Sequence, residues 1–166
     1  TFLEVKRKSN KGRTNKSRLE KEPNDMNHIS QSGEFLEELI SRSAGSLKAV
    51  ISTSFTRITL VCLERSERIT IDYNLRWNNL RGDSLSMPFL AIAEIKSEKS
   101  TSLSPFFTRL KELGIRRSGF SKYAVGMALV NRTPRQNYLK PKFLLLNRIK
   151  NEYYRNDTAR QRRGDD

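Results

Sequence analysis

The segment "SFTRITLVCLERSERITIDYNLRW", residues 54–77, constrains the fold more than any other part of the sequence. Two runs rich in β-branched residues flank the polar tripeptide "RSE", which predicts an antiparallel hairpin. The second run alternates strictly. Its apolar positions are Ile69, Ile71, Tyr73, Leu75 and Trp77. Its polar positions are Arg68, Thr70, Asp72, Asn74 and Arg76. The alternation predicts a sheet with one buried face and one face in water.

Three other parts of the chain are interpreted as extended. "TFLEVKRK", residues 1–8, alternates like a strand and leads through a turn centred on Gly12 into a second short, cation-rich strand. "FLAIAEIKSEK", residues 89–99, is a strand that follows a predicted loop over residues 78–88. "SGFSKYAVGMALVN", residues 118–131, is interpreted as extended, with a helix as the alternative.

Two segments have the end signals of helices. Residues 32–47 carry apolar residues at helical spacing, with Ser32 as a plausible N-cap and Gly45 past the end. In residues 102–114, Ser104 is the expected N-cap, Pro105 occupies the first helical position and Gly114 ends the helix.

Together these segments predict one α+β domain of five or six mostly antiparallel strands with two or three helices outside. At 166 residues the chain is long enough to bury a sizeable core. Residues 1–132 are expected to form the domain itself and 133–150 an extension with a possible short helix near 141–150. Residues 151–166 are expected to be a polar, disordered tail.

The charge of the chain indicates a polyanionic partner. Lys and Arg number 32 against 18 Asp and Glu, a formal net charge of +14. Such an excess repels itself in a compact state unless anions lie among the cations. Nucleic acid, inorganic phosphate chains, nucleotides and anionic lipid headgroups all satisfy this requirement.

Cysteine and histidine are too rare for several kinds of site. Cys62 is the only cysteine, which excludes an internal disulfide and a cysteine-built metal site. His28 is the only histidine, which argues against a histidine-rich metal site or a histidine-based triad. No apolar run approaches the roughly 18 residues that span a bilayer, so a cytoplasmic location is expected.

A Glu-x-Lys pattern occurs on two of the expected strands. Glu4, Lys6 and Lys8 share one side of the first strand, as Glu94 and Lys96 share one side of the strand at 89–99. Densely charged strand faces remain stable if they line a water-filled barrel whose apolar side faces helices. Cations gathered in this way would hold phosphate oxygens, and a glutamate could hold a hard divalent cation, with Glu94 favoured over Glu4.

Each motif taken singly also has a simpler interpretation. A lone Glu-x-Lys on a strand is most often a solvated ion pair. Arg68 and Asp72 could be ordinary surface residues, and the cations between Lys6 and Arg18 could be a nucleic-acid patch or a solvated hairpin. The argument for a phosphate site rests on the same pattern occurring on several strands.

The ordered motifs resemble a known family. "FLEVKRKSNKGRTNKSR", "SFTRITLV" with "RITIDYNLRW", "LAIAEIKS" and "LGIRRSGFSKYAVGM" are similar to the C-terminal two-thirds of a VTC domain, over about residues 2–130. This is the polyphosphate polymerase branch of the triphosphate tunnel metalloenzymes. The resemblance implies an antiparallel β-barrel, the triphosphate tunnel, with helices packed outside. It also implies that further strands come from the same protein or another chain.

The resemblance further implies ATP-dependent growth of inorganic polyphosphate, with Mn²⁺ or Mg²⁺ as cofactor. The residues expected to bind phosphate are Lys6, Lys8, Lys16, Arg18, Arg57, Arg68, Lys96, Ser121 and Lys122. Of these, Lys6, Arg57, Arg68, Lys96 and Lys122 are expected to be catalytic, and Glu94 is expected to hold the metal. Phe55 stands where the family often has tyrosine, so a hydroxyl contact is missing.

Other functions stay open at this point. The same tunnel could hydrolyse inorganic or organic triphosphates, or it could bind polyphosphate or a nucleotide without catalysis. A nucleic-acid binder is less favoured, because the sequence contains neither an RNP-type aromatic pair nor a helix-turn-helix.

Overall fold

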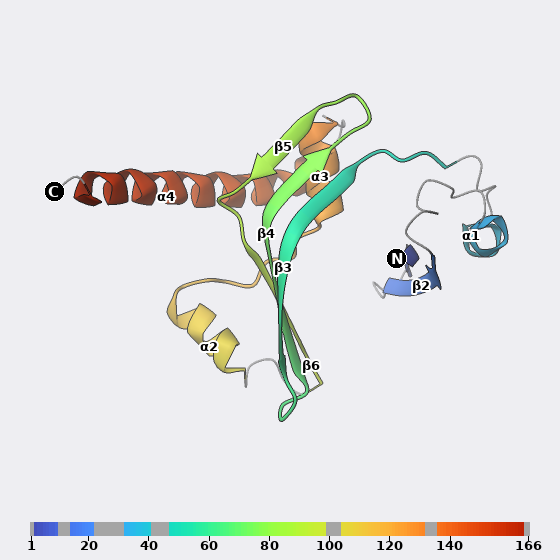
Figure 1. Ribbon diagram of the computed structural model, residues 1–166, viewed down its shortest axis with the longest axis horizontal. Coiled ribbons are helices and arrows are strands. Elements are labelled where there is room, and N and C mark those ends of the chain that lie inside the picture. The colour runs from blue at the N-terminus through green and yellow to red at the C-terminus, as the bar shows by residue number, and fades with distance from the viewer. Residues whose placement is uncertain are drawn as a thin grey trace. The chain divides into compact units, whose positions relative to one another are not determined.

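The computed structural model describes residues 2–9, 14–21, 32–40, 47–98, 104–131 and 136–164. The chain divides into two compact units, Thr1–Ala49 and Val50–Asp166, which are treated separately below (Figure 1). Helices and antiparallel sheets occur together, so the predicted α+β class is confirmed.

The first unit contains the predicted hairpin. Strand β1 (Phe2–Lys8) pairs antiparallel with β2 (Thr14–Glu20), and Lys6 lies opposite Lys16 in this register. The predicted turn at Gly12 lies outside the described residues.

The predicted first helix is present as α1 (Gly33–Ile40), with Leu36 buried. Ser32 was expected to cap it, but its buried Oγ has no hydrogen-bond partner among the described residues, so that prediction is wrong. At the other end of the helix, the carbonyl of Leu39 accepts a hydrogen bond of 3.1 Å from the Arg7 guanidinium, which satisfies one of the free carbonyls of the last turn. Gly45 lies outside the described residues.

The second unit is built on a four-stranded antiparallel sheet. Its central strand, β4 (Glu67–Asn78), pairs on one side with β3 (Ser52–Cys62), which confirms the predicted hairpin. Two shorter strands, β5 (Ser84–Met87) and β6 (Ile92–Ser97), share the other side of β4. The sheet is open because β3 does not pair with β5 or β6, so the described strands do not form the predicted barrel.

Strand β5 lies inside residues 78–88, which were predicted to be a loop. In the register with β4, Met87 lies opposite Leu75 and Leu85 lies opposite Trp77. The run "SLSM" is too short to stand out from a loop in the sequence, but its two apolar side chains pack into the core.

A β-bulge in β4 decides which side chains share a face. Pairing with β3 is regular up to the pair Thr56–Tyr73 and continues from the pair Ser54–Arg76. Between these pairs β3 has one residue and β4 has two, so β4 contains one extra residue. Asn74, at this step, has a positive φ of 54°, a conformation that asparagine adopts more readily than most residues. One extra residue in a strand turns every later side chain to the opposite face.

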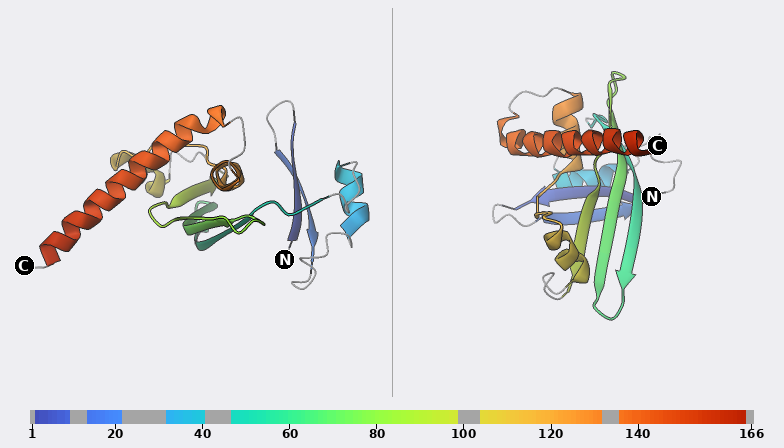
Figure 2. Two further views of the ribbon diagram at one scale, coloured as in Figure 1. Left: turned by 90° about the horizontal axis from the view of Figure 1, so that it is seen from above. Right: turned by 90° about the vertical axis from the view of Figure 1, so that its left-hand side faces the viewer.

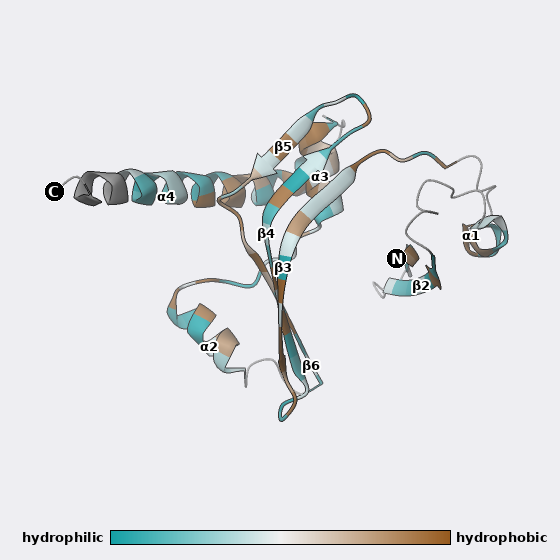
Figure 3. Ribbon diagram, viewed as in Figure 1, coloured by the Kyte–Doolittle hydropathy of each residue, from teal (hydrophilic) through white to brown (hydrophobic). Residues whose placement is uncertain are grey.

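The bulge makes the predicted face wrong for Leu75 and Trp77. From Arg68 to Asn78, polar and apolar residues alternate in the sequence of β4. Figure 3 shows hydrophilic and hydrophobic residues along this strand. In space, however, both residues lie on the face of Asp72 instead of the face of Ile69 and Ile71. Leu75 and Trp77 are fully buried there and form the centre of the core.

Helix α3 (Lys122–Val130) packs on this face of the sheet (Figure 2). The indole Nε1 of Trp77 donates a hydrogen bond of 3.0 Å to the carbonyl of Lys122. Helix and indole lie so close that a Cβ on Gly126 would be 2.2 Å from Cδ1 of Trp77. The buried core residues are Leu75, Trp77, Met87, Leu90, Val125, Val130 and Leu146.

The interpretation of residues 118–131 as extended is therefore wrong. The Oγ of Ser121 caps α3 by accepting a hydrogen bond of 3.2 Å from the amide of Ala124. Side chains on several sides of the helix are buried, so the sequence is apolar at most positions and shows no helical period.

The predicted signals of the helix at 102–114 are confirmed. Helix α2 (Pro105–Glu112) has Pro105 at its start, and the Oγ of Ser104 accepts a hydrogen bond of 3.3 Å from the amide of Phe107. Gly114 follows with a positive φ of 71°, a conformation that suits glycine at a helix end.

The C-terminal part differs from its prediction. A short 3₁₀ turn (Asn137–Leu139) leads into α4 (Lys140–Gly164), so the short helix continues through most of the expected disordered tail. No glycine or proline interrupts residues 142–163, which explains the continuity. Leu146 is buried, whereas the side chains of residues 151–158 are exposed. None of the described helices is long and apolar enough to cross a membrane.

The close packing of α3 on β4 gives a first prediction. Gly126→Ala should destabilise the second unit by about 1–3 kcal/mol, because the added methyl group overlaps the indole of Trp77. Urea unfolding followed by the fluorescence of the single tryptophan measures the change. Gly119→Ala is the matched control, since a Cβ there meets nothing within 4 Å. Equal stability of the two variants would contradict this packing.

Candidate functional site

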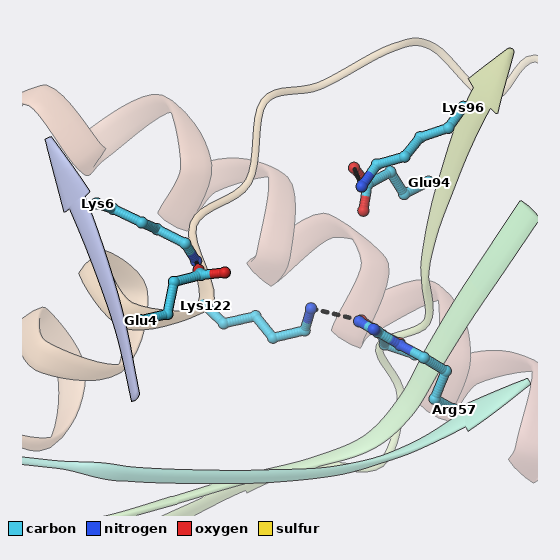
Figure 4. Close-up of polar contacts among 7 residues, drawn as sticks. Glu4, Lys6, Arg57, Glu94, Lys96 and Lys122 are labelled. Carbon is cyan, nitrogen blue, oxygen red and sulfur yellow. Dashed lines mark hydrogen bonds and ion pairs between the residues drawn. The ribbon is translucent and has the colours of Figure 1, made fainter. Parts of the chain in front are cut away.

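Two cations and one carboxylate meet on the sheet of the second unit. The Arg57 guanidinium donates from Nε and Nη2 to the two oxygens of Asp72, at 2.6 and 2.8 Å. The Lys122 ammonium lies 2.5 Å from Oδ2 of the same carboxylate. Figure 4 shows the side chains of Arg57 and Lys122 pointing toward one another. Asp72 is only 3 % exposed, so one buried anion holds both cations.

The fold explains why these three residues meet. Arg57 and Asp72 lie directly opposite one another in the β3–β4 register. The bulge at Asn74 then brings Trp77 to the same face, and Trp77 holds the first turn of α3 through the carbonyl of Lys122. The start of the helix is thereby fixed beside Asp72.

Phe55 completes the cluster from strand β3. The Arg57 guanidinium lies 5.1 Å from the centre of its ring, and the Lys122 ammonium lies 4.6 Å from it. Both distances allow a cation–π attraction. The ring therefore contacts both cations beside the carboxylate that they share.

The electrostatics keep Asp72 ionised. Hydrogen bonds from Arg57 lower the pKa of Asp72 from 3.8 to about 2, and Lys122 adds to this, although burial opposes it. The same hydrogen bond raises the pKa of the Arg57 guanidinium. Asp72 is consequently a poor general base at neutral pH, and the cluster keeps a net positive charge.

The cluster also has free donors for an anion. A guanidinium has five N–H groups, and Arg57 uses two of them on Asp72. The Arg57 side chain is 45 % exposed, so its other N–H groups can reach a ligand. Lys122 likewise has three donors, of which Asp72 takes one.

A second group of charges lies further along the same face. Arg68 of β4 is opposite Lys96 of β6, and Thr70 is opposite Glu94. The Lys96 ammonium lies 3.3 Å from Glu94, and both side chains are about half exposed (Figure 4). Arg68 and Asp72 are four residues apart on one strand, which separates them by roughly 13 Å.

We call this surface the cationic face. It consists of Arg57, Arg68, Lys96 and Lys122 with the two carboxylates Asp72 and Glu94. Four of the predicted catalytic residues and the predicted metal ligand therefore share one face of one unit.

The remaining predicted cations lie on the hairpin of the first unit. Glu4 there accepts ion pairs from Lys6 at 2.8 Å and from Arg18 at 2.5 Å, and these lower its pKa from 4.5 to about 2. Lys16 lies opposite Lys6 on the same face, and Lys8 continues β1 opposite Thr14. The first Glu-x-Lys motif is thus an ion-paired strand, which was its simpler interpretation.

Ser121 was expected to contact phosphate from an extended segment. Its Oγ instead accepts the capping hydrogen bond of α3, which occupies one of the acceptor positions of the hydroxyl. A phosphate contact through the hydroxyl proton stays a prediction.

The two candidate metal ligands differ in availability. Two cations already occupy the carboxylate of Glu4, whereas Glu94 is 57 % exposed and pairs with Lys96 at the longer distance of 3.3 Å. Within the described residues, no group of three His, Cys, Asp or Glu side chains lies together. This donor set does not suit a metal held by protein alone. It does suit Mg²⁺ or Mn²⁺ that arrives with phosphate and takes one carboxylate.

Sequence reasoning missed the central residue of the site. Asp72 was assigned to the polar face of its strand, with an ordinary surface residue as the simpler alternative, and it was given no role of its own. Phe55 was noted only as a departure from tyrosine. A turn at "RSE", as predicted, would place Asp72 opposite Leu60. The observed turn covers residues 63–66 and is closed by the pair Cys62–Glu67, which places Asp72 opposite Arg57. The position of the turn is therefore the signal that could have identified the pair.

The cluster suggests a stability test in acid. Because the pKa of Asp72 is below its unfolded value, the ionised carboxylate should stabilise the second unit fully above about pH 4. That contribution should be lost as the pH falls to about 2. Asp72→Asn should therefore cost about 1–3 kcal/mol near neutral pH, and less in acid.

Urea unfolding at about pH 6 and about pH 2.5 measures the difference. The control is Asp157→Asn on the exposed part of α4, which should keep the acid dependence of the wild type. If Asp72→Asn lowers the free energy of unfolding by the same amount at both pH values, the ionised Asp72 carboxylate is not the source of the stability.

Comparison with known proteins adds one finding. The family model described as VTC domain matches residues 1–131, a range that includes β1 to β6 and α1 to α3. Neither the curated proteins nor the solved structures yield a match to this chain.

Proposed function

The chain belongs to the VTC-domain family, a family linked to polyphosphate polymerase, and on that basis we propose that its cationic face binds the phosphate chain of ATP or of inorganic polyphosphate. The observation that carries the proposal is the cluster of Arg57 and Lys122 on the buried carboxylate of Asp72. Two cations fixed side by side with free donors fit the closely spaced oxygens of a phosphate chain.

The proposed ligand lies along β4. Arg57 and Lys122 bind one part of the phosphate chain, and Arg68 with Lys96 binds the next part, roughly 13 Å away along the strand. The formal charge of +14 supports a polyanion over a singly charged ligand. The hairpin cations Lys6, Lys8, Lys16 and Arg18 supply a further phosphate-binding surface in the first unit.

The proposed reaction is phosphoryl transfer. A terminal oxygen of a polyphosphate chain attacks the γ-phosphorus of ATP, the bond between the β,γ-bridging oxygen and the γ-phosphorus breaks, and ADP leaves. Such a transfer needs positioning and charge neutralisation more than a protein base. Glu94 is the residue that would hold a Mn²⁺ or Mg²⁺ bound to the nucleotide, and this metal would neutralise phosphate charge.

Two related functions use the same residues. If water replaces the chain end as acceptor, the domain is a triphosphatase, and if no transfer occurs it is a polyphosphate- or nucleotide-binding module. The position of Lys96 and Arg68 beside Glu94 favours a metal-bound triphosphate over nucleic acid, because a plain nucleic-acid surface needs no carboxylate there.

Binding to the cationic face can be tested without catalysis. Arg68→Gln should weaken the binding of tripolyphosphate by about tenfold, since it removes a charge-assisted contact. Isothermal titration calorimetry measures the affinity. Arg76→Gln is the matched control, because Arg76 is an exposed cation of the same strand on the opposite face. Equal losses in both proteins would mean that only the overall charge matters.

One product assay separates the three candidate functions and tests the role of Glu94. The protein is incubated with ATP and Mn²⁺, and the products are run on a polyphosphate gel while free phosphate is measured. Chain growth indicates a polymerase and phosphate release without chains indicates a hydrolase. Glu94→Gln should abolish either reaction and leave the unfolding midpoint unchanged. Turnover equal to that of the wild type would remove Glu94 from the metal site.

A further inference from the structure

Asp72 is neither a residue that could contact the bound phosphate or metal nor a surface residue. It is 3 % exposed, and its two oxygens accept three hydrogen bonds or ion pairs, from Nε and Nη2 of Arg57 and from the Lys122 ammonium. An oxygen so enclosed and occupied is not accessible to a metal or to phosphate. Its carboxylate also opposes the binding of an anion by its charge alone.

Because its charge opposes anion binding, a buried carboxylate beside two phosphate-binding cations needs an explanation. Removing it would raise the positive charge of the cationic face and should, by simple Coulomb attraction, favour an anionic ligand. The geometry supplies the explanation. The fork of Arg57 is planar, and two parallel hydrogen bonds to one carboxylate fix its plane as well as its position.

Lys122 is fixed by the same carboxylate from the other side. Its backbone is held by the indole of Trp77, its ammonium by Asp72, and the ring of Phe55 lies beside the ammonium. A lysine side chain that moved freely would lose much rotational entropy on binding a ligand. Here that entropy is already lost in the folded state.

We propose that Asp72 is a positioning residue that holds Arg57 and Lys122 in the geometry that binds phosphate, without contacting the ligand itself. This role rests on the proposed function of the cationic face, because Asp72 would orient the cations of that face before the ligand binds. Asp72 lowers the electrostatic attraction for the ligand, but this loss is smaller than the gain from two cations that are already in place.

The direction in which binding changes when one carboxylate is neutralised tests the proposal. Asp72→Asn and Glu94→Gln each remove one negative charge from the same sheet face, and both are titrated with tripolyphosphate in buffer that contains a metal chelator. Glu94→Gln should bind more tightly than the wild type, because the half-exposed Glu94 holds Lys96 through only one contact of 3.3 Å and otherwise repels the ligand. Asp72→Asn should bind about tenfold more weakly, because its partners are no longer held. Binding of Asp72→Asn as tight as the wild type or tighter would overturn the proposal.

Two further measurements separate positioning from a merely structural role. In an Arg57→Gln, Lys122→Gln background, Asp72→Asn should no longer weaken binding and should strengthen it slightly, since the residues that it positions are gone and only its repulsion of the anion is removed. If Asp72→Asn does not fold, Arg57→Lys replaces it, because this variant keeps every charge and loses the two-pronged contact. Arg57→Lys should bind at least about fivefold more weakly. Unchanged binding of Arg57→Lys would equally sink the idea.

The outcomes also distinguish this proposal from the one before it. No binding of tripolyphosphate by the wild-type protein means that the cationic face is not a phosphate site. Binding by the wild type that persists in Asp72→Asn means that the site exists and that Asp72 does not position its cations.

Discussion

The second unit depends on the one-residue bulge at Asn74, where the pairing of β3 and β4 changes step. One face of β4 carries the charged side chains Arg68 and Asp72 before the bulge, and the same face carries Leu75 and Trp77 after it. A hydrophobic core and a polar site therefore lie on one side of one strand. Helix α3 can pack on the core and present Lys122 to the site because the two regions are continuous.

The arrangement at Asp72 follows general rules for buried charge. A carboxylate withdrawn from water is costly unless opposite charges and hydrogen bonds compensate it, and Arg57 with Lys122 supplies both. Both cations remain accessible because their side chains lie at the edge of the buried region. Glu4 of the first unit also pairs with two cations, but it lies on an open hairpin, where water screens such pairs more strongly.

Local signals in the sequence identified much of this fold, and long-range geometry accounts for what they missed. The two hairpins and α2 were predictable because strand alternation and the Ser104 N-cap depend only on residues that are close together in the sequence. The bulge was not predictable, because the alternation of residue types continues unbroken through Asn74 while the backbone changes face. Helix α3 was only the alternative interpretation of residues 118–131, because its burial on several sides removes the helical period. The cations of the site were predictable as a set, whereas the role of Asp72 depends on its burial.

The burial of Leu146 has a consequence for where this domain ends. The family model stops at residue 131, yet Leu146 of α4 completes the core around Trp77 and Val125, with Phe143 and Ile149 beside it. The second unit therefore extends beyond the C-terminal end of the segment that the family shares. A boundary drawn from family resemblance alone would cut through the hydrophobic interior, and the α4 turn that carries Leu146 belongs to the domain even though the family model does not include it.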